Sequence, residues 1–186
     1  KELFEIAADK TVMVTERQRI NFRLKDPLTG KVNVVAYRGF TEHEIETLRR
    51  ITPHPMSEQV FASGKPLVIN DHIGPGVSGL LARTQSVAWI PIKAGPKVVG
   101  VLGISDDQSR PFAANEVELL QAIGLAVRHV HLHPCCFGEE RRILEGFGER
   151  FAHRLDAVVR YIGRHDVGSS KLRARKDELH ELALLG

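Results

Sequence analysis

Residues 86–105 read SVAWIPIKAGPKVVGVLGIS, and this stretch decides the fold. Ser86–Lys93 and Lys97–Ser105 are nearly continuous apolar runs separated by Ala94-Gly95-Pro96. A spacing this short predicts a hairpin, so the two runs are expected to be adjacent antiparallel strands. A nucleotide-binding βαβ unit would instead need a crossover helix between parallel strands.

The segments around this hairpin predict the other elements of one domain. A turn at 26–30 separates two of the expected strands, and Thr41 followed by Glu44 is a capping-box signature for a helix. Apolar residues recur at helical spacing after Phe112. Strands are expected at 11–14, 19–24, 31–37 and 67–70, and helices at 42–51, at 57–62 and from Phe112 to about His133.

Three segments in a fixed order resemble those of a known family. They read GKPLVIND at 64–71, WIPI leading into VVGVLGI at 89–104, and PFAANEVELL at 111–120. In this order they resemble the second half of a GAF domain, and the resemblance extends over about residues 11–133. It implies an α+β fold with a GAF-like central antiparallel sheet flanked by helices, followed by a C-terminal helical extension.

The resemblance also implies a ligand pocket between the sheet and the connection at 71–86. That connection carries Asp71, His72 and Arg83 near the apolar strand that bears Trp89, so these four residues are the expected ligand-binding set. We hypothesise that Arg83 or His72 fixes a polar or anionic group over the apolar floor. Each of the four also has a plain structural explanation, as a loop carboxylate, solvated imidazole, surface guanidinium and core indole respectively.

The ligand itself is unknown. Phytochrome-type members attach a bilin through a cysteine within the domain, and free methionine sulfoxide reductases of this fold also need such cysteines. No cysteine precedes Cys135 in this chain. The Asn-Lys-Phe-Asp-Glu set of members that bind cyclic nucleotides has no match either. Two possibilities therefore remain for the pocket: it binds a small ligand non-covalently, haem included, or it is purely structural.

Two other motifs compete with this interpretation. The sequence GPGVSG at 74–79 matches a dinucleotide-binding loop, but only 80–85 is available for the helix that such a unit requires.

Histidines and cysteines, whose imidazole and thiolate groups are the ligands that zinc prefers, lie close together in the sequence near the end of the last predicted helix. Adjacent cysteines close a single tetrahedral site poorly, so no metal is predicted, and the candidate ligands are His129, His133, Cys135 and Cys136.

The composition changes after residue 138, which divides the chain into an expected sensory domain at 1–133 and a helical signalling extension at 134–186. One narrow apolar stripe follows the charged helix of this extension, with spacings of 3, 4, 4, 3 and 4 residues. A stripe of this kind needs a partner, so a homodimer through the helices is expected. Its members are Leu144, Phe147, Phe151, Leu155, Val158 and Ile162.

Charge, cysteine content and the length of the apolar runs indicate the cellular location and the kinds of partner. Residues 1–138 carry 16 basic and 14 acidic side chains, and 139–186 carry 10 and 9, so no basic face for nucleic acid is expected. The only cysteines are neighbours, and no signal peptide opens the chain, which favours a cytoplasmic location. No apolar run reaches the ~20 residues of a membrane span, so no membrane contact by this fragment is expected.

These observations predict a non-catalytic module of signal transduction. A GAF domain would bind a small ligand and relay its state through dimerising helices to an output domain. Residues 171–185 resemble the approach to the dimerisation helix of bacterial sensor histidine kinases, which favours a kinase of a two-component system over a nucleotide cyclase or a transcription activator. Two alternatives stay open: a GAF dimerisation module without a ligand, and a metal or redox switch that uses the cluster at 129–136.

Overall fold

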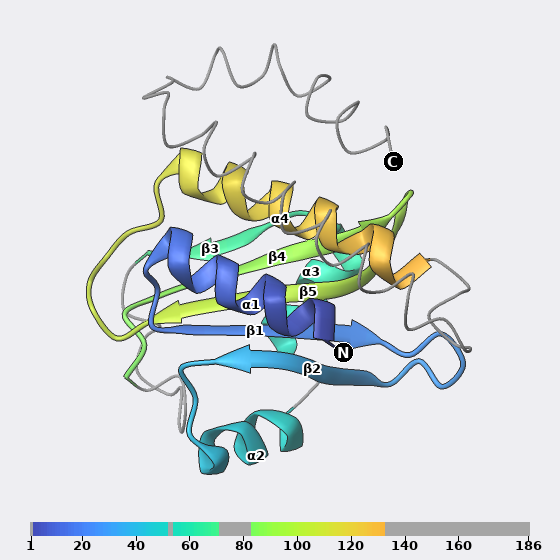
Figure 1. The fold of residues 1–186 in the computed structure, drawn as a ribbon, viewed down its shortest axis with the longest axis horizontal. Helices are drawn as coiled ribbons and strands as arrows, with labels where there is room; N and C mark the ends of the chain where they lie inside the picture. Colours follow the sequence, from blue (N-terminus) through green and yellow to red (C-terminus); the bar gives the residue numbers. More distant parts are fainter. Residues whose placement is uncertain (1, 52–53, 71–82, 133–186) are drawn as a thin grey trace.

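A five-stranded antiparallel sheet forms the centre of the part of the chain that the structure describes (Figure 1). The computed structural model describes residues 2–51, 54–70 and 83–132. The strand order is β2-β1-β5-β4-β3, and every neighbouring pair is antiparallel. The strands are β1 (Arg19–Lys25), β2 (Val32–Arg38), β3 (Leu67–Ile69), β4 (Ser86–Ala94) and β5 (Lys97–Asp106).

The predicted hairpin is confirmed. Strand β4 pairs with β5 over its whole length, with Trp89 opposite Gly103 and Ala94 opposite Lys97. Gly95 turns the chain between them at φ 60°, a left-handed conformation that glycine adopts without a steric penalty. Because these neighbouring strands are antiparallel and joined directly, the dinucleotide-binding interpretation of 74–79 is excluded by topology.

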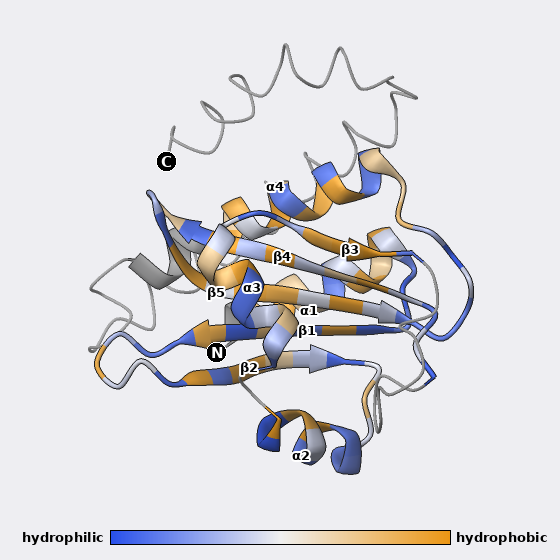
Figure 2. Cartoon of the chain, turned by 180° about the vertical axis from the view of Figure 1, so that it is seen from behind, coloured by the Kyte–Doolittle hydropathy of each residue, from blue (hydrophilic) through white to orange (hydrophobic). Residues whose placement is uncertain are grey.

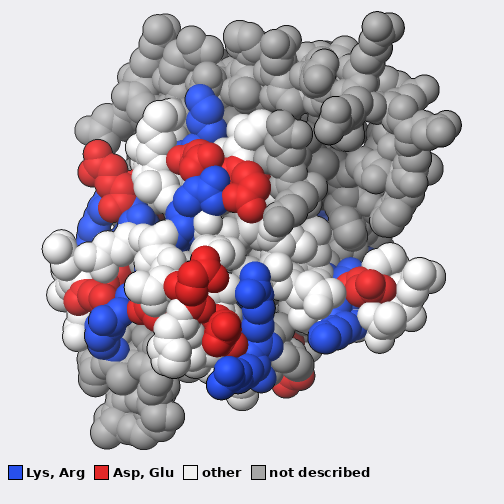
Figure 3. All heavy atoms as spheres, turned by 60° about the horizontal axis from the view of Figure 1, so that its bottom comes forward, with Lys and Arg blue, Asp and Glu red and all other residues white. Residues whose placement is uncertain are grey.

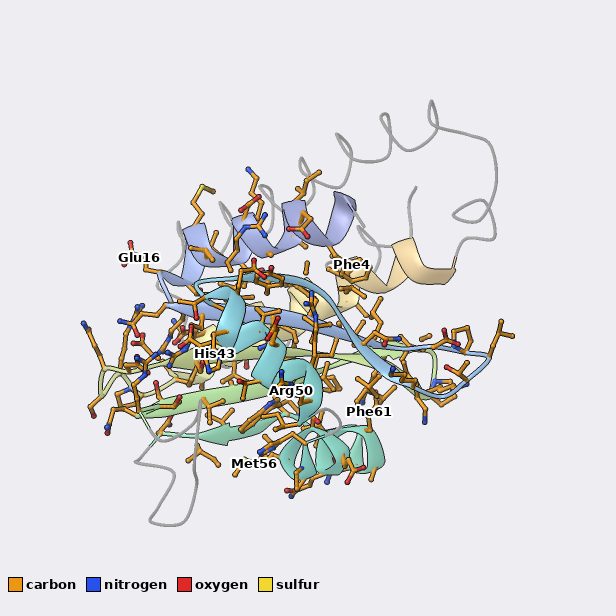
Figure 4. The ribbon with its side chains drawn as sticks, turned by 90° about the horizontal axis from the view of Figure 1, so that it is seen from below. Phe4, Glu16, His43, Arg50, Met56 and Phe61 are labelled. Atoms are coloured by element: carbon orange, nitrogen blue, oxygen red, sulfur yellow. The ribbon has the colours of Figure 1, made fainter. Side chains whose placement is uncertain are left out.

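Helices cover both faces of the sheet, as the GAF-like arrangement implies. They are α1 (Glu2–Thr15), α2 (Glu42–Arg50), α3 (Pro55–Ser63) and α4 (Ala114–Leu132). Helices α1 and α4 lie side by side over one face, and α3 lies over the opposite face, which Figure 2 shows from behind. Figure 4 shows both layers edge-on: Phe4 extends from α1 toward the sheet, and Met56 and Phe61 belong to α3 on the other side.

The larger core lies under α1 and α4. Alternate residues of β1 face this side, and Phe22 meets Phe4 of α1 edge-on with ring centroids 5.6 Å apart. From α4, three of the apolar residues that recur at helical spacing after Phe112 are fully buried, namely Leu120, Ile123 and Val127. Gly124 lets this helix approach closely, since a Cβ there would lie 3.3 Å from the carbonyl oxygen of Pro91.

The strand predicted at 11–14 is wrong, because these residues continue α1. Their β-branched side chains favour strands locally, but the helix places Thr11 and Thr15 on its buried face. The two hydroxyls donate to the carbonyl oxygens one turn earlier, Thr11 to Ala7 at 2.6 Å and Thr15 to Thr11 at 2.7 Å. Packing against the sheet therefore outweighs intrinsic propensity.

The short helices confirm the capping signals. Thr41 accepts from the backbone of Glu44, whose side chain accepts in turn from the backbone of Thr41, so the predicted capping box starts α2. Helix α3 begins at Pro55 rather than at the predicted Ser57, because proline suits the first turn of a helix. Gly64 ends α3 in a left-handed conformation at φ 62°.

Candidate functional site

The face of the sheet under α3 contains a row of buried polar side chains. Strand β1 has the sequence RINFRLK, and its apolar side chains face α1 and α4. The alternation of a strand therefore turns Arg19, Asn21 and Arg23 to the opposite face. These three residues are only 3%, 5% and 4% exposed, which is unusual for arginine and indicates a specific role for each side chain.

Arg19 is fully engaged in local interactions. Its Nε donates to Ser105 Oγ at 3.2 Å, and its Nη2 donates to Thr84 Oγ1 at 3.2 Å. The same guanidinium forms an ion pair with Asp107. Arg19 thus joins the start of β1 to the end of β5, and its charge is neutralised by a neighbour.

Asn21 links the row to the next strand. Its Nδ2 donates to the carbonyl oxygen of Gly103 at 3.3 Å, and its Oδ1 accepts from Arg23 Nε at 2.8 Å. The missing side chain of Gly103 makes this possible, because a Cβ there would lie 2.9 Å from Asn21 Nδ2. Gly103 and Asn21 together orient the Arg23 guanidinium.

Arg23 is the exceptional member of the row. Its Nη1 is buried and has no hydrogen-bond partner among the described residues. Within the same residues, no carboxylate forms an ion pair with it. Burial alone lowers the pKa of Arg23 to about 10, so the group remains a cation at neutral pH.

An aromatic wall lies beside this polar row. Trp89 of β4 sits opposite Gly103 and stacks on the ring of His54, with centroids 6.2 Å apart and planes 9° apart. Trp89 is 3% exposed and belongs to a second, smaller core under α3. The other members of that core are Val60, Val87 and Val101, with Met56, Phe61, Leu67 and Ile69 packed against them.

His54 is held as a neutral ring by its structural position. It is the N-cap of α3, and its Nδ1 accepts from the backbone N–H of Met56 at 3.3 Å. The proton of the neutral ring is therefore on Nε2. Burial, and then the positive charge of Arg23, lower the pKa of His54 below its ordinary value.

The arrangement is thus amphipathic. On one side lies a buried cation whose Nη1 has no partner among the described residues, and on the other side lies an aromatic and aliphatic wall. Such a combination suits the binding of a small molecule with both polar and apolar parts. We call the set Arg23, Asn21, His54 and Trp89 the polar-aromatic face.

The four ligand-binding residues predicted from the sequence do not all lie at this face in the described structure. Trp89 belongs to the polar-aromatic face. The Arg83 side chain is 63% exposed and pairs with Glu44 of α2 at 2.6 Å and with Asp107 at 3.8 Å. It belongs to an ion network at the surface. Asp71 and His72 lie outside the described residues.

Sequence reasoning missed Arg23, Asn21 and His54. The available signal was the polar alternation in RINFRLK, where one face of a strand is apolar and the other carries two arginines and an asparagine. The candidate metal ligands lie outside the described side chains, with only the backbone of His129 within α4. Among the described residues, no three His, Cys, Asp or Glu side chains gather closely enough to hold a metal ion.

The outer surface carries charged side chains of both signs on the face that Figure 3 shows. Figure 3 shows basic and acidic side chains interspersed over this side of the molecule. Arg38, for example, pairs with Glu5 and with Asp9 at the edge formed by β2. None of the helices in the described part of the chain combines the length and apolar character of a membrane span.

Comparison with known proteins supports the fold. The family model of the GAF domain matches residues 2–129. The GAF domain/HD domain protein from Geobacter sulfurreducens is 14% identical with a TM-score of 0.61, covering 74% of this chain and 95% of that one. A domain described as part of a two-component sensor histidine kinase from Sinorhizobium meliloti 1021 is 18% identical with a TM-score of 0.57, covering 70% and 88%.

An enzyme also shares the fold. The type II free methionine-R-sulfoxide reductase from Thermoplasma acidophilum is 14% identical with a TM-score of 0.56, covering 69% of this chain and 89% of that one. At such identities these likenesses concern the fold alone. No curated protein matches the chain.

Proposed function

The chain is a member of the GAF domain family, whose members are sensory and regulatory modules of signalling proteins, and on this premise we propose that it senses a small ligand. The ligand binds at the polar-aromatic face, beneath the connection at 71–86. Asp71 and His72 of that connection are proposed to complete its surroundings, and Arg83 to anchor the end of the connection on α2. The protein is proposed to act in the cytoplasm without catalysing a reaction.

The observation that carries this proposal is the buried cation on the sheet. A domain that needed only a stable core would gain nothing from an arginine whose Nη1 has no partner among the described residues. Burying a charge without compensation costs several kcal/mol. Such a group is retained most readily where it serves binding.

The sheet provides a route from the ligand to the helices. Neighbouring residues of β1 face opposite sides, so Arg23 lies beneath the ligand while Phe22 packs against Phe4 of α1. Strand β4 carries Trp89 on one face and Ile90 on the other, in the core with α4. A ligand that favours one arrangement of these strands would also favour one position of the helices.

The output is proposed to lie beyond α4. The charged segment at 139–162 would dimerise through its apolar stripe and carry the state to an output domain, for which a histidine kinase is the best supported choice. The support is the resemblance of residues 171–185 to the approach to a kinase dimerisation helix. The fold shared with the Sinorhizobium kinase domain is consistent with it.

Tryptophan fluorescence tests ligand sensing directly, because Trp89 is the only tryptophan in the chain. Titration with a library of small metabolites is expected to find compounds that shift its emission saturably and raise the melting temperature. Trp89→Phe should abolish the optical signal and leave the thermal shift largely in place. A library without any such compound would contradict ligand sensing.

A dimerisation module without a ligand is the second candidate. It is favoured by the close packing of Trp89, which is 3% exposed and stacked on His54, since a filled face leaves less room for a guest. The same titration separates the two functions. A purely structural module would remain dimeric and show no saturable change with any compound.

A further inference from the structure

We propose that the ligand is a small monocarboxylate with an apolar body, whose carboxylate is bound by the guanidinium of Arg23. This inference rests on the proposed ligand-sensing function and adds the chemical class of the ligand. Three observations support it: the buried Nη1 donor of Arg23 without a partner among the described residues, the charges of the groups around it, and the apolar character of the adjoining wall.

The open donor calls for an acceptor that carries negative charge. Arg23 Nε is occupied by Asn21 Oδ1 at 2.8 Å, which leaves the buried Nη1 without a partner among the described residues. A neutral acceptor would satisfy the hydrogen bond but leave the buried cation uncompensated. A carboxylate does both, and hydrogen bonds between two charged groups are roughly twice as strong as neutral ones.

Among the described residues of the polar row and the wall beside it, Arg23 carries the one positive charge without an ion-pair partner. Arg19, the nearest cation in the row, already forms an ion pair with Asp107. His54 remains neutral, because its Nδ1 accepts from Met56 N–H and protonation would break that cap. A single uncompensated cation among the described residues matches a monoanion, whereas a phosphate monoester carries nearly two negative charges and would leave one of them buried.

The wall beside Arg23 selects the rest of the molecule. Trp89 and Val60 are 3% and 0% exposed, and Leu67 packs against them from β3. Each apolar group that leaves water here contributes about 25 cal/mol per Å² of buried surface. A bare inorganic anion would gain none of this, so an aromatic or branched aliphatic acid is the expected ligand.

The test uses pairs of probes with the same shape and different charge on the whole chain. Benzoate and isobutyrate are compared with benzamide and isobutyramide, and inorganic phosphate is a third arm. Trp89 fluorescence and thermal shift are the two readouts. We expect the wild-type protein to bind at least one acid about tenfold more tightly than its amide.

Two arginine variants test whether Arg23 causes the preference for acid over amide. Arg23→Met is expected to abolish the preference for acid over amide, while the protein stays folded, because methionine removes a buried uncompensated charge. Circular dichroism and the melting curve verify folding. Arg50→Met is the matched control: it removes an exposed arginine that is paired with Glu46, and it should keep the preference.

Each outcome has a defined meaning. Equal affinity for acid and amide, tighter binding of phosphate than of either acid, or a preference that survives in Arg23→Met would each overturn the inference. So would the absence of binding by every monocarboxylate tried up to about 10 mM. In these cases ligand sensing itself still stands if the wider metabolite library contains a neutral or dianionic ligand, so the two failures are distinguishable.

Discussion

The guanidinium of Arg17 holds the carboxylate of Glu116 through two hydrogen bonds of 2.8 and 2.6 Å. Arg17 is fully buried and lies 3.8 Å above the ring of Phe112, and its Nη1 also donates to Ser86 Oγ and to the carbonyl oxygen of Arg110. The pair ties the end of α1 to the first turn of α4. In the proposed mechanism, these two helices therefore move as one unit.

Glu116→Ala is expected to lower the free energy of unfolding by about 3 kcal/mol, because it leaves the buried Arg17 guanidinium with only its longer ion pair to Asp106, at 3.8 Å. Urea denaturation monitored by circular dichroism measures this change. The matched control is Glu46→Ala, which removes the exposed i,i+4 pair with Arg50 and should cost less than about 0.5 kcal/mol. Equal effects of the two variants would show that the Arg17 clamp is dispensable.

Gly103→Ala is expected to destabilise the protein by about 1–3 kcal/mol, because the new methyl group would meet Asn21 Nδ2 at 2.9 Å. The same methyl group should cost much less in an Asn21→Ala background, where its space is free. A double-mutant cycle in urea measures the coupling between the two sites. Additive effects would mean that Asn21 does not lie against Gly103.

His54 is expected to titrate below its ordinary pKa of 6.5, owing to burial and then to the charge of Arg23. As the pH falls, His54 therefore takes up a proton in the unfolded state before it does so in the folded state. The stabilisation of the folded state by neutral His54 is complete above pH 6.5, and it declines as the pH falls toward the lowered pKa of the folded state. NMR of the imidazole protons against pH measures it.

The neighbouring arginine provides the control for that titration. Arg23→Met should raise the pKa of His54, because it removes a positive charge nearby, whereas Arg83→Met should leave it unchanged. A His54 pKa that does not respond to Arg23→Met would place the two groups out of electrostatic contact.

Phe151→Glu combined with Leu155→Glu is expected to convert a dimer of the whole chain into monomer, because charges would interrupt the apolar stripe at 144–162. Sedimentation equilibrium measures the mass. Arg154→Ala with Asp156→Ala changes the same turns off the stripe and should preserve the dimer. Persistence of the dimer in the glutamate variant would mean that the stripe packs within its own chain.

The sequence allowed most of the fold to be predicted, because its strongest signals are local and mutually consistent. The short link at 94–96 implied the β4–β5 hairpin, and Thr41 with Glu44 implied the start of α2. The strand predicted at 11–14 was wrong because the local signal there did not agree with the tertiary packing. There the local preference for a strand was overridden by packing of α1 on the sheet, which a single sequence does not display.

The candidate site was predictable only in part. Trp89 was among the predicted residues because an apolar strand adjoining a long connection suggests a pocket wall. Arg23 was not, because an arginine in a strand is usually exposed, and its burial depends on Asn21 and on the missing side chain of Gly103 one strand away. Such relations between strands follow from register, which spacing within one strand does not reveal.

Native mass spectrometry of the whole chain, purified without denaturation from its natural source, tests whether a carboxylic acid binds at Arg23. Wild-type protein should retain a small molecule that proves on release to be a carboxylic acid, and Arg23→Met protein should lack it. Wild-type protein of the bare polypeptide mass, with no acid able to restore an adduct, would show that no such ligand binds. A molecule retained equally by the Arg23→Met variant would show that Arg23 does not bind it.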